Sequence, residues 1–230
     1  MTDSRSFSRR AFLGGLGLAG IAGGAAAARA WLPDTPSVAH AQEHQPDQPV
    51  PMTHNMVEGD VDSAANGFDP SAILTDFDYG TVSTLPSGQT LREYTIVASE
   101  KLIEIAPGVI FPAWVYNGRV PGPTLRCTQG DRLRITFTNG STHPHSIHFH
   151  GIHRPLMDGL QPVQPGERFV YEFDAEPFGL HLYHCHTVPF RRHIHKGLYG
   201  AFIIDPPTPR PPAKELVMVM NAFDTNFDAE

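Results

Sequence analysis

The sequence comprises 230 residues with 17 basic and 24 acidic side chains, a formal net charge of −7. This length accommodates one domain or one and a half. An acidic chain without a block of basic residues argues against nucleic acid, and against an anionic membrane surface, as the main partner. Histidine is the unusual residue: there are 13, and ten of them lie between His143 and His195. Clustering of that kind indicates a binding site.

The first 41 residues have the pattern of an export signal. Arg9 and Arg10 precede an apolar run from Ala11 to Ala28, and small-residue cleavage sites end at Ala30 and Ala41. Because this run is mostly glycine and alanine, it is only weakly hydrophobic, which favours a cleaved twin-arginine-type signal over a retained membrane anchor. We therefore expect a periplasmic or secreted protein whose mature form has no membrane span.

The next segment, residues 42–89, is rich in proline, aspartate, asparagine and glycine. A segment of this composition buries little apolar surface, so we expect an irregular linker or arm, with at most one short helix near residues 70–76. Within it, MTHNM at residues 52–56 offers two thioethers and an imidazole to a soft metal ion. A polar loop is the simpler interpretation of the same five residues.

Short strands are expected from residue 90 to residue 207. The segments LRITF and FVYEF alternate apolar with polar side chains, and EYTIVA, IHFHGI, LHLYHCH and LYGAFII are further candidates. Turn sequences such as NGRVPGP, TQGD, TNGS, QPGE and EPFG separate them. Regular short strands with such turns predict an all-β fold, a Greek-key β-sandwich or barrel.

The last part of the sequence changes character. DPPTPRPP, residues 205–212, has the composition of a stiff linker, and ELVMVMNAF after it has the pattern of a strand. Few residues follow that strand before residue 230. We interpret residues 208–230 as a linker and the start of a second, apparently truncated domain.

Two histidine-rich segments can be read through strand geometry, in which neighbouring side chains point to opposite faces. One is HLYHCHTVPFRRHIH, residues 181–195, with five histidines and a cysteine, and the other is HSIHFHG, residues 145–151. If both contain strands and these strands are adjacent, parity sorts the side chains into two groups. On one side four imidazoles would converge, those of His148, His150, His184 and His186. On the other side the thiol of Cys185 would meet the imidazole of His145.

The residues on the thiol side are typical of a blue-copper site. A thiolate with two imidazoles is the trigonal ligand set of such sites, which have a weak or absent axial ligand. The second imidazole could come from His193 or His195 downstream. The opposite side presents only imidazoles, which suits two or three copper ions completed by histidines of another domain.

At these residues the sequence resembles the multicopper oxidases. HPHSIHFHGIH is similar to their H-x-x-H-x-H motif, and YHCHTVPFRRHIHKGLYG to their H-C-H…H-x-x-x-x-[L/M] motif. WVYNGRVPGPTLRCTQGD resembles an early strand pair of the family. The likeness covers about residues 90–225 and is greatest to small, two-domain laccase-like oxidases with the blue copper in the first domain. It implies that residues 90–207 are a cupredoxin (plastocyanin-like) domain.

The resemblance also implies copper ligands and their roles. By site, the ligands would be His145, Cys185 and His193 for the type 1 copper, with Leu198 axial and not coordinating, His148 for the type 2 copper, and His150, His184 and His186 for the type 3 pair. A small reducing substrate or a protein donor would supply electrons at the type 1 copper. Cys185, His184 and His186 would carry them to the trinuclear cluster, where dioxygen is reduced to water. Asp158 is a candidate for proton supply.

The sequence departs from this family in two respects. The gap between Cys185 and His193 is longer than in large multicopper oxidases and closer to that of copper nitrite reductases. In addition, half of the trinuclear cluster should come from a second cupredoxin domain, supplied in two-domain members by the neighbouring subunit of a trimer. That domain is not within these 230 residues. We therefore expect a C-terminally truncated fragment of a homotrimeric enzyme, inactive in dioxygen reduction on its own.

Other functions explain fewer of these residues. Copper nitrite reductases usually have an aspartate in place of His148, a residue other than histidine in place of His186, and an axial methionine. A cupredoxin electron carrier or simple copper-binding protein has no use for the four imidazoles opposite Cys185. Zinc suits histidine and cysteine but does not require the alternation H-C-H. A disulfide between Cys127 and Cys185 is possible in an exported protein, but histidines surround Cys185, and Cys127 is expected to be a small buried hydrophobe.

The remaining histidines of the cluster are assigned no metal. His143, His153, His181 and His195 are expected to support ligands, to line a substrate rim or to lie at the surface. His181 has the same parity as Cys185, which would bring it toward the type 1 site.

Overall fold

Alternation of apolar and polar side chains produces the central strands of the fold. In the computed structural model, which describes residues 59–225, β6 spans Arg132–Asn139 and buries Leu133, Ile135 and Phe137. The polar residues between them point to the other face of the sheet. This is the pattern of an antiparallel-type sheet with one face on a core and one toward solvent.

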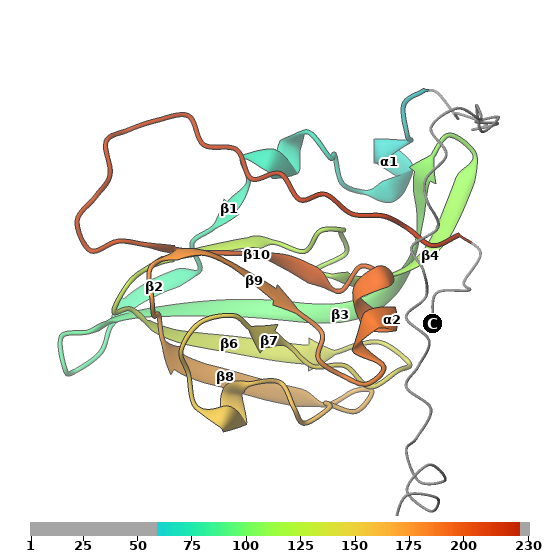
Figure 1. The fold of residues 1–230 in the computed structure, drawn as a ribbon. Coiled ribbons are helices and arrows are strands. Elements are labelled where there is room, and N and C mark those ends of the chain that lie inside the picture. The colour runs from blue at the N-terminus through green and yellow to red at the C-terminus, as the bar shows by residue number, and fades with distance from the viewer. Residues whose placement is uncertain (1–58, 226–230) are drawn as a thin grey trace, which may run out of the picture. The chain divides into compact units, whose positions relative to one another are not determined.

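Two sheets are built from such strands (Figure 1). The first has the order β1-β5-β10-β9-β7, with bounds Phe77–Asp78, Thr124–Thr128, Tyr199–Asp205, Gly179–His184 and His148–Phe149. The second has the order β2-β3-β6-β8, with β2 at Thr81–Thr84, β3 at Thr90–Ala106 and β8 at Arg168–Asp174, and β4 (Val109–Tyr116) pairs with β3. Parallel pairs, β5 with β10 and β3 with β6, occur beside antiparallel ones.

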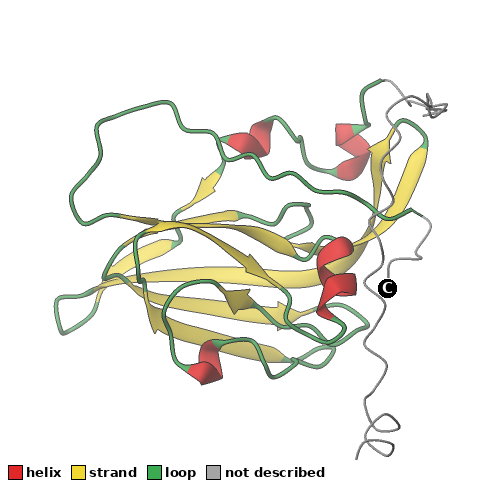
Figure 2. Cartoon of the chain, viewed as in Figure 1, coloured by secondary structure: helices red, strands yellow, loops and turns green. Residues whose placement is uncertain are grey.

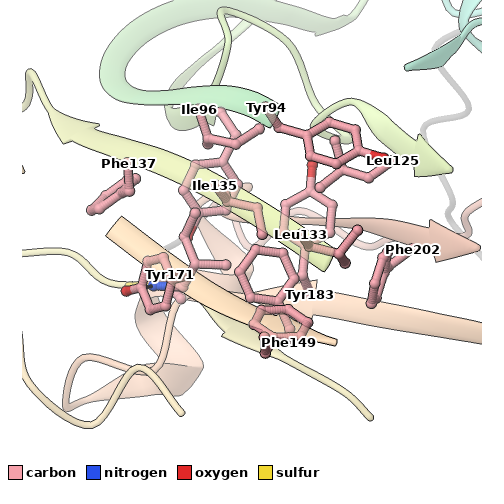
Figure 3. Close-up of a cluster of buried hydrophobic side chains, with 14 of the residues drawn as sticks. Tyr94, Ile96, Leu125, Leu133, Ile135, Phe137, Phe149, Tyr171, Tyr183 and Phe202 are labelled. Atoms are coloured by element: carbon pink, nitrogen blue, oxygen red, sulfur yellow. Dashed lines mark hydrogen bonds between the residues drawn. The ribbon is translucent and has the colours of Figure 1, made fainter. Parts of the chain in front are cut away.

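Aromatic and aliphatic side chains of both sheets fill the space between them (Figure 3). Tyr183 of β9 and Phe149 of β7 are fully buried, with ring centroids 5.7 Å apart. The buried hydroxyl of Tyr183 donates a hydrogen bond to the carbonyl oxygen of Pro123 at 2.7 Å, so its polar end is satisfied. Burial of each large side chain contributes roughly 1.5–3 kcal/mol. The core therefore fixes β7 and β9, the two strands that carry the histidine motifs.

The expected all-β sandwich is confirmed, and the helices lie in the connections (Figure 2). They are short: α1 at Ser63–Asn66, η1 at Ala72–Leu74, η2 at Pro155–Met157 and α2 at Phe190–His195. Only the turn at η1 falls where the sequence suggested a helix. The α2 helix was not expected, because six residues rich in arginine and histidine show no apolar periodicity.

The described residues differ from the expected organisation at both ends. Residues 59–89 are not wholly irregular, because β1 pairs in parallel with β5, and β2 pairs with β3. Each sheet thus gains an edge strand from the expected arm. The strand expected in ELVMVM is not formed, although the backbone N–H of Val217 bonds the carbonyl oxygen of Leu74 at 2.9 Å. The export signal and the MTHNM stretch lie outside the described residues.

Among residues 59–225, no helix has the length and apolar character needed to cross a membrane.

Candidate metal centre

The two histidine-rich segments meet where β7 pairs with β9. His148 lies opposite His184 in this antiparallel ladder, and Phe149 lies opposite Tyr183. Since the two aromatic rings are fully buried in the core, the two imidazoles share the other face of the sheet. The adjacency on which the parity interpretation depends is therefore present.

On the inner side, one thiol and two imidazoles converge. His145, Cys185 and His193 are all buried, and their potential ligand atoms lie within 4.8 Å of one another. The Sγ of Cys185 is 3.2 Å from Nδ1 of His193 and 3.9 Å from Nδ1 of His145, and the two Nδ1 atoms are 3.0 Å apart. Three donor atoms of this kind around one point form a trigonal N₂S set.

The third member of this cluster is positioned by α2. The helix follows Pro189 and turns the chain back, so that His193 in its last turn faces Cys185. Gly197 ends the turn with φ +120, where an added Cβ would lie 2.7 Å from the carbonyl oxygen of Trp114. Backbone bonds then tie Leu198 to both ligands: its N–H bonds the oxygen of His193, and its oxygen accepts from the N–H of Cys185. Leu198 is fully buried beside them, and its axial role stays a prediction.

The protonation of this cluster suits a metal ion. Burial lowers the pKa of His145 to about 3 and that of His193 to about 4, so both imidazoles are neutral at pH 7 and have a lone pair to offer. Burial also raises the pKa of the Cys185 thiol, despite hydrogen bonds from Ser146 and Thr187. A thiolate here needs a compensating positive charge. Neither imidazole supplies it, so the donor set fits a bound cation.

These pKa values predict that the metal-free protein loses stability in mild acid. An unfolded histidine takes up a proton near pH 6.5, whereas folded His145 and His193 do not until about pH 3 and pH 4. As the pH falls from 6.5 to 5, each should therefore lower the free energy of unfolding by about 1.4 kcal/mol per pH unit. Urea unfolding of metal-free wild type and His193→Gln measures this. The variant should lose the contribution of His193, about 1.4 kcal/mol per pH unit of the wild-type slope, and equal slopes would contradict the prediction.

On the outer side, four imidazoles and one carboxylate form a second cluster. Two overlapping groups have ligand atoms within 4.8 Å of one another: His148 with His150 and His184, and His148 with Asp158 and His186. The Nε2 atoms of His150 and His184 are 3.3 Å apart. Burial lowers the pKa of both these histidines, which favours the neutral, metal-binding form.

Backbone carbonyl groups orient the rings of this second cluster. Nδ1 of His148 and Nδ1 of His186 lie 3.2 and 3.1 Å from the carbonyl oxygen of Asp158. Nδ1 of His184 lies 2.9 Å from the carbonyl oxygen of Cys185. A carbonyl oxygen only accepts, so each Nδ1 carries the hydrogen and each Nε2 keeps a free lone pair. Three imidazoles are thus prepared as ligands through Nε2.

Asp158 is more central than the sequence indicated. One of its carboxylate oxygens lies 3.1 Å from Nδ1 of His148, in addition to the carbonyl contacts. Gly159 holds it there with φ +72, because an added Cβ would lie 2.4 Å from the carbonyl oxygen of Ile147. The only sequence signal for a role of Asp158 was the turn sequence MDG. That sequence does not reveal which strand the turn approaches.

The other histidines take separate positions. His143 packs on Trp114, with ring centroids 4.8 Å apart, and Trp114 in turn contacts both His145 and His193. His181 is not in the Cys185 cluster: its Nε2 lies 2.8 Å from the carbonyl oxygen of Pro177. Among the described residues, His153 and His195 also belong to neither cluster. The Nε2 of His153 bonds the carbonyl oxygen of Phe149 instead. Both cysteines are free thiols, with Cys127 buried elsewhere in the core.

Comparison with known proteins places this geometry in a family. Residues 98–209 match the family model of the multicopper oxidases. They form a multicopper oxidase domain. A solved multicopper oxidase structure aligns with a TM-score of 0.72 and 56% identity over 74% of this chain and 62% of its own. This likeness extends to the cupredoxin-like arrangement of the sheets.

Curated relatives of the multicopper oxidase domain include two kinds of copper enzyme. A copper-containing nitrite reductase of Neisseria meningitidis is 32% identical over 130 residues, 55% of this chain and 34% of the relative. A laccase of Ustilaginoidea virens is 42% identical over 98 residues, 39% of this chain and 14% of the relative. The matched regions thus span only 34% and 14% of the length of these two relatives. The family is one of copper oxidoreductases, and both clusters offer donors that copper accepts.

Proposed function

We propose that this domain takes up electrons at the buried cluster and passes them to the outer cluster of a laccase-like oxidase that reduces dioxygen to water. The observation that carries the proposal is the placement of three consecutive residues. The side chain of Cys185 belongs to the buried cluster, whereas those of His184 and His186 belong to the outer one. One residue triplet therefore joins the two clusters through covalent bonds.

The copper ligands in this proposal follow the two clusters. The type 1 copper would be held by His145, Cys185 and His193 with Leu198 axial and not coordinating, the type 2 copper by His148, and the type 3 pair by His150, His184 and His186. Copper bound there would supply one-electron transfer at the thiolate site and dioxygen reduction at the imidazole site. In the described residues the outer cluster offers four imidazoles, so further ligands must come from elsewhere, and we propose a second domain of a neighbouring subunit in a homotrimer.

The residues between the two clusters would provide the path for the electrons. A direct chain of bonds runs from the Cys185 sulfur through its backbone to the rings on either side. A second connection is the bond from Nδ1 of His184 to the carbonyl oxygen of Cys185 at 2.9 Å. The β9–β10 ladder ends at His184, and the bond from the N–H of Cys185 to the oxygen of Leu198 at 3.0 Å continues it, so backbone hydrogen bonds hold both connections in place. Such rigidity suits repeated electron transfer.

Protons for the reduction would come through Asp158. Its carboxylate is 30% exposed and lies 3.1 Å from Nδ1 of His148, so it reaches both water and the outer cluster. A partly hydrated carboxylate in that place can relay a proton between solvent and the outer cluster.

Electron donors would approach on the side of Trp114. A hollow of about 320 Å³ is lined there by Trp114, His143, Arg192 and Lys196 among others. Trp114 stands against both imidazoles of the buried cluster, with ring centroids 5.0 and 4.8 Å away. We propose a small reducing substrate or a protein donor as the partner, and the periplasm or the exterior of the cell as the location.

Nitrite is the alternative acceptor, since a nitrite reductase is among the relatives. The test is to reduce the copper-loaded protein in its native assembly without oxygen and then to add dioxygen or nitrite separately. We expect dioxygen to restore the absorption of the oxidised thiolate site within the time of one turnover, and nitrite to leave it reduced. Recovery with nitrite alone would identify a nitrite reductase, and recovery with neither would identify an electron carrier.

A further inference from the structure

A single carboxylate oxygen collects the hydrogen bonds of the loop before His145. Oε1 of Glu100, on β3, accepts from the hydroxyl of Ser141 at 2.8 Å and from the backbone N–H and hydroxyl of Thr142 at 2.9 and 2.7 Å. Nδ1 of His143 lies 3.3 Å away. Glu100 is 45 residues from His145 in sequence and touches no ligand of either cluster directly.

Ser141 connects this carboxylate to the buried cluster. Its Oγ lies 2.9 Å from Nε2 of His145 and 2.8 Å from Oε1 of Glu100. A carboxylate only accepts, so the single hydroxyl hydrogen of Ser141 points to Glu100. The hydroxyl oxygen must then accept from Nε2–H of His145. This order of donors gives His145 its hydrogen on Nε2 and leaves the Nδ1 lone pair directed at the buried cluster.

The relay links a partly exposed, negatively charged carboxylate to a buried imidazole. Burial alone would raise the pKa of Glu100, but the bonds from Thr142, Ser141 and His143 outweigh it and lower the pKa to about 2. The Glu100 side chain is 37% exposed, whereas Ser141 and His145 are buried, so water screens the interaction between the carboxylate and the imidazole only in part.

We propose that Glu100 is a positioning residue for the metal centre, fixing the tautomer of His145 through Ser141 and lowering the reduction potential of copper bound at the Cys185 cluster. The reason for the second effect is electrostatic. A carboxylate behind the imidazole makes Nδ1 a stronger electron donor, and a stronger donor favours Cu(II) over Cu(I). This part rests on the proposed function, whereas the tautomer does not depend on copper.

The potential is tested with Glu100→Gln, which keeps the shape of the side chain and removes its charge. We expect the blue absorption to remain and the reduction equilibrium to shift about tenfold toward Cu(I), or about 59 mV for one electron. Ser141→Ala should shift it in the same direction. The matched control is Glu104→Gln on the same strand, because Glu104 accepts backbone bonds from Asp62 and Gly108 and has none to the cluster. It should leave the potential unchanged.

The tautomer is tested without copper, by ¹⁵N NMR of the His145 ring in the metal-free protein. We expect hydrogen on Nε2 in the wild type and in Glu104→Gln, and a mixture of tautomers in Ser141→Ala. An unchanged tautomer in Ser141→Ala together with an unchanged potential in Glu100→Gln would overturn the proposal and leave Glu100 as a loop anchor only. Absence of any blue centre in the wild type would refute the proposed function. The NMR measurement of the His145 tautomer would still show whether Glu100 and Ser141 fix the position of its hydrogen.

Discussion

Replacing Cys185 with serine is expected to abolish both the blue absorption of the copper-loaded protein and its turnover with a reducing substrate. Serine offers a neutral hydroxyl that does not ionise near neutral pH, so the thiolate needed for the intense colour of such sites is lost. The same change removes the sulfur that stands 3.2 Å from Nδ1 of His193 and begins the connection to the outer cluster. Visible absorption measures the first loss, and steady-state oxygen uptake by the native assembly, which completes the outer cluster, measures the second.

Cys127→Ser is the matched control for this experiment. Cys127 is equally buried, but its Sγ lies 3.7 Å from the carbonyl oxygen of Ile203 and not near the histidines. We expect this variant to keep the blue band. Equal loss of colour in both variants would mean that a general disturbance of the core, and not a missing ligand, removes the copper.

Replacing Phe149 with alanine is expected to lower the free energy of unfolding by about 3–5 kcal/mol. Its ring is fully buried among four aromatic rings, with centroid distances of 5.4–5.8 Å to Tyr171, Phe173, Tyr183 and Phe202. The surrounding rings belong to both sheets and cannot all close the space. Since Phe149 lies between His148 and His150, the outer cluster should also lose order and bind copper more weakly.

Urea unfolding of the metal-free protein checks this prediction. The control is Phe178→Ala, because that ring is 56% exposed and its removal should change stability by no more than about 0.5 kcal/mol. A loss below about 1 kcal/mol in Phe149→Ala would show that β7 is held by something other than its aromatic contacts.

Strand geometry accounts for how much of the site could be predicted. Alternation in HFH and HCH separates the thiol from the flanking imidazoles whatever the rest of the chain does, because successive side chains of a strand point to opposite faces. The pairing of His148 with His184 needed the structure, since β7 has only two residues. The apolar alternation of β6 and β8 likewise predicted a sandwich, although it did not reveal that β3 and β6 are parallel.

Other parts depend on contacts that sequence patterns do not encode. The short helix α2 has no apolar periodicity, so the position of His193 came from family spacing alone. From a turn, Asp158 contacts two imidazoles of the outer cluster through its backbone carbonyl group. Glu100 lies on a distant strand and is connected to His145 only through Ser141. His181 shares the parity of Cys185 yet bonds Pro177, because parity defines a face of the strand and not a position along it.

X-ray absorption at the copper edge, on protein loaded with one equivalent of copper, tests the central claim most directly. The claim is that the buried cluster is a copper site made of one sulfur and two imidazole nitrogens. We expect a nearest shell with one short copper–sulfur distance and two nitrogen distances, lost in Cys185→Ser and retained in Cys127→Ser. A shell of nitrogen and oxygen only would contradict the claim, because it would place the first copper in the outer imidazole cluster and leave Cys185 without a metal.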